Sequence, residues 1–126
     1  MNMIVKVLAG LLCVLFIAMG VQSMFTPEWA IAQFGVTPDS AHGLNTLRGD
    51  LGGLFLASAA MIALGLIRGV TTWFLAVALL MGLIALGRLV GFVMDGPHPA
   101  AVMPFIVELV IIAVMLAAYR RLGATA

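Results

Sequence analysis

Four long apolar stretches decide what this chain can fold into. A helix of ~20 residues crosses the ~30 Å hydrocarbon core of a bilayer. In lipid the backbone must satisfy its own hydrogen bonds, so only helices and closed barrels can span it. The stretches lack the alternation of apolar and polar residues that barrel strands show, so we expect helices. They cover residues 4–24, 47–67, 71–94 and 101–119.

The composition agrees with a membrane protein. Hydrophobic residues make up 64% of the chain and charged residues 9%, against roughly 25% charged residues in an ordinary soluble domain. The net charge of +1 provides no basic surface for nucleic acid. We predict an all-α integral membrane four-helix bundle with up-down-up-down topology, as a single transmembrane domain over residues 1–126.

The first stretch has a second interpretation. Lys6 followed by the apolar residues 7–21 is typical of a signal peptide, and Val21-Gln22-Ser23 would serve as its cleavage site. We favour four uncleaved helices. Cys13 is the only cysteine, which excludes an intrachain disulfide and a cysteine-based metal cluster.

Positive residues in short loops predict the orientation, because they favour the cytoplasmic side. If the stretches alternate in direction, the outer side carries Glu28, Asp39 and Asp95. We therefore predict the bacterial inner membrane with both termini in the cytoplasm. The positive residues on the predicted inner side are Lys6, Arg68, Arg120 and Arg121.

The longest connection, the outer loop 25–46, contains a predicted short helix. Thr26 followed by Pro27 indicates a helix start, and Gly35 indicates its end. We expect this helix to lie at the membrane interface, with Trp29 anchored at headgroup level. The alternative is that the loop only covers the bundle.

Charged residues within or beside the apolar stretches mark the candidate site: Arg48, Asp50, Arg88 and Glu108. A lone charge at mid-bilayer costs roughly 2.5–3.5 kcal/mol, so such residues usually pair or line a polar cavity. The predicted topology brings all four to a similar depth near the outer face. We expect Arg88 to pair with Glu108, and Asp50 to pair with one of the two arginines.

The charge cluster has three interpretations: an ion-pair network that only fixes helix docking, a polar pocket that binds a head group, and a proton or ion path. We favour binding of an amphipathic small molecule, such as a lipid or quinone. Arg48 and Arg88 would hold its anionic or carbonyl head, and Asp50 and Glu108 would orient the arginines. Binding predicts a concave apolar space beside the cluster.

The alternative function is an accessory subunit that packs against a larger membrane complex. It predicts a closed, fully paired cluster and an exposed glycine-rich flank. Four-residue spacing places Gly49 with Gly53 and Gly87 with Gly91 on one helix face each, where a neighbouring backbone can approach. We expect packing within the chain, with a homodimer face as the alternative.

Evidence for catalysis or metal binding is weak. His42 and His98 are expected in outer loops near Asp39 and Asp95, but their spacing matches no established metal pattern. The serines lack a nucleophile motif. We predict no catalytic residue, no metal and no cofactor, and we do not expect an enzyme.

The segment 47–57, Leu-Arg-Gly-Asp-Leu-Gly-Gly-Leu-Phe-Leu-Ala, resembles a bacterial family of small four-helix membrane proteins catalogued as a domain of unknown function. The family looks like the DoxX-type bundles in general form. The resemblance continues through residues 87–91, the turn 95–97, Glu108 and Arg120-Arg121. It implies the fold and topology but no substrate. The phrase 41–45 is also similar to membrane glutathione-transferase-like enzymes, but the residues that follow do not continue that motif.

Overall fold

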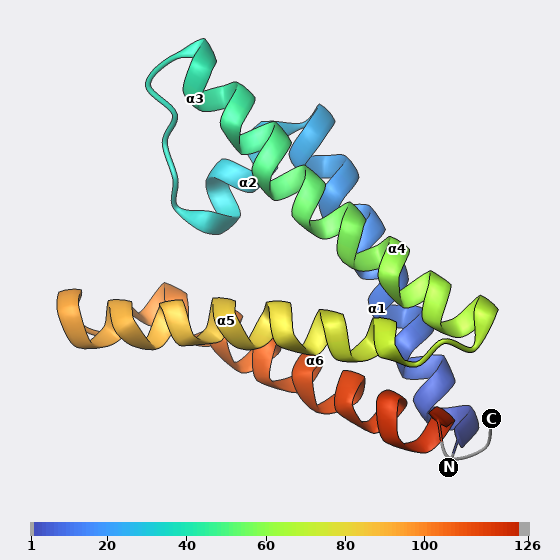
Figure 1. The fold of residues 1–126 in the computed structure, drawn as a ribbon. Helices are drawn as coiled ribbons and strands as arrows, with labels where there is room; N and C mark the ends of the chain where they lie inside the picture. Colours follow the sequence, from blue (N-terminus) through green and yellow to red (C-terminus); the bar gives the residue numbers. More distant parts are fainter. Residues whose placement is uncertain (1, 124–126) are drawn as a thin grey trace.

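The protein is all-α in a computed structural model that describes residues 2–123 (Figure 1). Four of its helices are long and apolar enough to cross a membrane, which confirms the predicted class. The second of them is continuous from Ala41 to Arg68 and contains α3, a π-helical turn η1 and α4. The elements are α1 (Asn2–Phe25), α2 (Pro27–Phe34), α3 (Ala41–Thr46), η1 (Leu47–Leu51), α4 (Gly52–Arg68), α5 (Thr72–Asp95) and α6 (Pro99–Gly123).

The long helices form two pairs, which we call the first arm (α1 with α3, η1 and α4) and the second arm (α5 with α6). Within each arm the helices pack along each other, and the arms meet through contacts of α1 with α6 and of α4 with α5. The arms converge at the end where α4 leads into α5, and they diverge toward α3 and the far end of α5 (Figure 1). α1 begins and α6 ends at the converging end.

One group of fully buried side chains lies at the converging end. They come from the second half of α4, the start of α5 and the end of α6. Lipid is as apolar as the side chains, so close packing of the helices contributes more here than the exclusion of water. Fully buried examples are Ile62, Phe74, Val77, Met115 and Ala118.

Three glycines allow the closest helix approaches. A Cβ atom added to Gly20 would lie 2.6 Å from Leu56 Cγ, and one added to Gly65 would lie 2.7 Å from the Phe74 ring. A Cβ atom on Gly52 would meet the Met24 side chain. The lack of a side chain at these three positions therefore lets α1 pack closely against α4, and α4 against α5.

The glycines predicted to pack within the chain do not do so. A Cβ atom added to Gly49, Gly53, Gly87 or Gly91 would meet nothing within 4 Å. Their spacing places each pair on one helix face, but that face does not meet a neighbouring helix. The prediction of intrachain packing is wrong for these four positions, and the homodimer alternative stays a prediction.

The predicted short helix is present as α2. Gly35 ends it in the left-handed region with a φ of 65°, where its N–H donates to the Ile31 carbonyl. Thr26 occupies the N-cap position, but its hydroxyl donates to the Gln22 carbonyl of α1. α2 packs against α1 and η1, and Phe34 stacks on Phe55 of α4 with ring centroids 5.7 Å apart.

Candidate functional site

Arg88 of α5 and Glu108 of α6 form the predicted ion pair. The Arg88 Nε donates to the Glu108 Oε1 at 2.7 Å. The Glu108 side chain is only 10% exposed, whereas that of Arg88 is 27% exposed. Because α5 and α6 pack along each other and are joined by a short turn, the two residues reach the same level of the second arm.

Half of the Glu108 carboxylate is left without a partner. Its Oε2 is buried and accepts no hydrogen bond from any residue in the range 2–123. The Arg88 guanidinium makes one hydrogen bond within the same range, and it goes to Glu108. A buried acceptor without a partner costs about 1–3 kcal/mol, and more when it is charged. The pair therefore contains an unused buried acceptor next to unused donors.

A cavity of about 570 Å³ lies between the two arms and reaches this ion pair. Most of its wall is apolar and aromatic, and α2 contributes to it from the side of the first arm. Gln33 is a third polar residue on the wall. The lining residues are Leu15, Phe16, Met19, Trp29, Gln33, Phe34, Leu51, Leu54, Phe55, Met81, Ile84, Arg88, Ala100, Met103, Pro104, Val107, Glu108 and Ile111.

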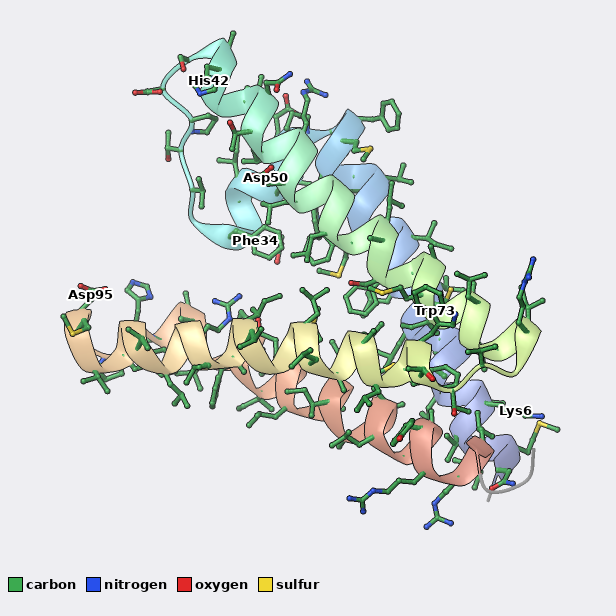
Figure 2. The ribbon with its side chains drawn as sticks, in the orientation of Figure 1. Lys6, Phe34, His42, Asp50, Trp73 and Asp95 are labelled. Carbon is green, nitrogen blue, oxygen red and sulfur yellow. The ribbon has the colours of Figure 1, made fainter. Side chains whose placement is uncertain are left out.

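Arg48 and Asp50 do not join the second-arm pair, contrary to the predicted four-residue cluster. Arg48 donates through Nη1 to the Met24 carbonyl near the end of α1. Asp50 is exposed on the first arm (Figure 2) and has no ion-pair partner in the described part of the chain. The predicted pairing of Asp50 with an arginine is wrong. Arg88 lies on the other, diverging arm (Figure 1). Arg48 lies two residues away on the same helix, where side chains do not face each other, and it donates to the Met24 carbonyl instead.

A second hollow of about 410 Å³ lies toward the tip of the second arm, where α5 ends and α6 begins. Gly87 and Gly91 line it together with Arg88, so this arginine borders both hollows. Asp95 and His98 lie at its far end. The absence of side chains on the two glycines leaves this space open.

The histidines do not assemble a metal site. Across residues 2–123, no group of three or more histidine, cysteine, aspartate or glutamate side chains could hold a metal ion. His42 lies at the tip of the first arm and Asp95 at the tip of the second (Figure 2). The His98 Nδ1 accepts a hydrogen bond from the Ala100 N–H.

Sequence reasoning missed the contribution of α2 to the cavity wall. Trp29 is predicted at the membrane interface, but it also lines the cavity, as Phe34 does, and their rings contact each other edge to face with centroids 5.9 Å apart. Two aromatic side chains on one short apolar helix were the sequence signal for this role. Gln33 had no sequence signal, since a single glutamine in a loop is unremarkable.

Comparison with known proteins gave one family. A family model described as a domain of unknown function (DUF4345) matches residues 4–119. The matched range includes α2 through α5 entirely and both members of the ion pair. No curated protein and no solved structure matches the chain.

Proposed function

The chain belongs to the DUF4345 family, in agreement with the resemblance of residues 47–57 to a family of unknown function, and we propose that it binds an amphipathic small molecule, such as a lipid or quinone, between its two arms. The observation that carries this proposal is the cavity of about 570 Å³ that reaches the Arg88–Glu108 pair. The apolar body of the ligand would lie along the aromatic wall, with its polar head at the ion pair.

The form of the cavity favours binding over a purely structural ion pair. Small-molecule sites are typically concave, mostly apolar and ~300–1,000 Å³ in volume, with a few polar groups that fix orientation. A pair that served only to dock helices would be closed and fully satisfied, whereas the Glu108 Oε2 is unpartnered. Arg48 and Asp50 are not part of the proposed head-group site, because neither lines the cavity.

The proposal includes a position in the bacterial inner membrane. An up-down-up-down arrangement with both termini in the cytoplasm would place the diverging tips of the arms on the outer side. The charge distribution supports this, with Lys6, Arg68 and Arg120 at the opposite end from Asp95. α2 would lie near the outer interface, where Trp29 could reach both headgroups and the cavity.

Native mass spectrometry of the protein released gently from its own membrane tests the proposal. We expect a discrete additional mass on the wild type. Val107→Trp should remove it, because Val107 lines the cavity. Val110→Trp is the matched control, since Val110 is an exposed valine on the same helix outside the cavity wall. A protein without added mass, or equal retention by both variants, would contradict binding in this cavity.

An accessory subunit is the second candidate, and the open glycine faces favour it. A Cβ atom on Gly49 or Gly53 of the first arm would have no neighbour within 4 Å among residues 2–123, so another helix could approach them. Gly53→Leu should then release a copurifying membrane protein, or a second copy, while the ligand mass is retained. If copurification were unchanged, that face would not be an interface.

A further inference from the structure

We infer that the head group recognised between the arms is a neutral hydroxyl, an alcohol or phenol on an apolar body, rather than an anion or a bare carbonyl. The inference rests on the proposed function and narrows its ligand class. It comes from the state of the Arg88–Glu108 pair, where one carboxylate oxygen and part of the guanidinium remain unused.

The unused Oε2 of Glu108 requires a hydrogen-bond donor. The side chain is nine-tenths buried, so bulk water is a poor substitute. A carboxylate can only accept, and a carbonyl, ether or ester head would face it with a second acceptor. A hydroxyl can donate to this oxygen with the extra strength of a bond to a charged group.

The guanidinium beside it requires an acceptor. Arg88 uses its Nε for Glu108, and its terminal N–H groups have no acceptor among residues 2–123. A hydroxyl oxygen has lone pairs as well as a proton, so one hydroxyl can serve both residues. Neither a pure acceptor nor a pure donor can do this.

The charge of the site excludes the ionic alternatives. Arg88 and Glu108 cancel, and the remaining cavity wall carries no ionisable residue. A sulfate or phosphate head would meet the free carboxylate oxygen, and an ammonium head would meet the guanidinium. In a largely apolar cavity the added charge would also lose its hydration without a counter-charge. A neutral hydroxyl avoids both penalties.

Two tryptophans make the test possible. Trp29 lines the cavity, whereas Trp73 lies outside its wall at the start of α5 (Figure 2). The full-length Trp73→Phe protein leaves Trp29 to report on the cavity, and Trp29→Phe leaves Trp73 to report on the surrounding lipid. Bromine quenches tryptophan fluorescence at short range. Each protein in phosphatidylcholine nanodiscs is titrated with 9,10-dibromostearyl alcohol, its methyl ether and its sulfate ester.

We expect the alcohol to quench Trp29 at about tenfold lower concentration than the ether or the sulfate. Trp73 should be quenched similarly by all three. Glu108→Gln removes the charged acceptor and leaves Arg88 without its counter-charge. The preference should then reverse toward the sulfate, an outcome that a merely structural role of Glu108 would not produce.

The remaining outcomes separate the two proposals. If Trp29 is quenched more than Trp73, but the ether or sulfate equals the alcohol, the cavity binds ligands and the hydroxyl inference is wrong. If the Glu108→Gln protein keeps the alcohol preference, the inference is also wrong. If no probe quenches Trp29 more than Trp73, both the inference and the proposed cavity are contradicted.

Discussion

At the scale of single residues, Glu108 is the one charged residue that is buried among residues 2–123. It is a buried carboxylate on an apolar helix, and its one ionic partner in the described range is Arg88 at 2.7 Å. Desolvation offsets much of the attraction in such a pair, so its net contribution to stability is small. Removal of one partner is different, because the other charge then remains buried and uncompensated.

Arg88→Leu should therefore destabilise the protein by about 3 kcal/mol, the lower end of the range for breaking buried pairs, since Arg88 is partly exposed. Thermal unfolding in detergent measures this loss. The double variant Arg88→Leu, Glu108→Leu is the control and should recover most of the stability. An unchanged unfolding temperature in the single variant would show that the pair does not form.

Arg48 and Asp50 lie two residues apart, but substitutions at the two positions should affect stability differently. Arg48 donates to the Met24 carbonyl near the end of α1, where a cation also interacts well with the helix dipole. Arg48→Met should cost about 1–3 kcal/mol by leaving that contact unmade. Asp50→Asn should change stability by less than about 0.5 kcal/mol, because Asp50 is exposed. Equal losses from both, in the same unfolding measurement, would contradict this assignment.

The sequence correctly predicted the Arg88–Glu108 pair but not the positions of Arg48 and Asp50, because the two sets are placed by different features of the fold. Arg88 and Glu108 belong to consecutive helices joined by a short turn, so their distances from that turn determine that they meet. Arg48 and Asp50 lie on the other arm, and the sequence indicates only their depth. Their lateral position depends on how far the arms diverge, which no residue pattern in the chain encodes.

At the scale of elements, hydropathy located the long helices but not the start of the second one. That helix was expected at residue 47, whereas it continues back to Ala41. Its first turns are polar, so they do not appear in an apolar stretch. The Ser40 hydroxyl accepts a hydrogen bond from the Gly43 N–H and caps them, a side-chain role typical of serine at a helix start.

Glycine spacing was a weak guide to helix contacts, and two glycines on α4 can show why. Gly65→Ala should cost about 1–3 kcal/mol, because the new Cβ would lie 2.7 Å from the ring of the fully buried Phe74. Gly53→Ala meets nothing within 4 Å and should be neutral or stabilise the helix by up to about 1 kcal/mol.

Thermal unfolding of the two alanine variants in the same detergent is a direct comparison, since both glycines lie within one helix. A large loss of stability from Gly53→Ala in the isolated protein would show that the predicted intrachain contact at Gly53 does form. A loss seen only in the native membrane would instead indicate a partner on that face.

At the scale of the whole molecule, the chain combines a packed end with an open end. Fully buried residues of α4, α5 and α6 gather where the arms converge, and the cavity lies between the arms with α2 on its wall. Apolar surfaces of equal hydrophobicity do not specify which helices pair in lipid. The sequence could therefore predict the four long helices, but not the two arms or the cavity between them.

The orientation of the arms decides from which side a ligand enters, and single cysteines can establish it. The variants are made in a Cys13→Ser background. Val36→Cys places a thiol in the connection after α2, and Pro97→Cys places one in the turn before α6. Val70→Cys places one between α4 and α5. All three positions are exposed. A membrane-impermeant maleimide added to intact bacterial spheroplasts should label the first two variants, and the third only after lysis, because Arg68 and the pair Arg120 and Arg121 favour the cytoplasmic side. Labelling of Val70→Cys in intact spheroplasts would show that the protein has the opposite orientation. A ligand would then enter the cavity from the cytoplasmic leaflet.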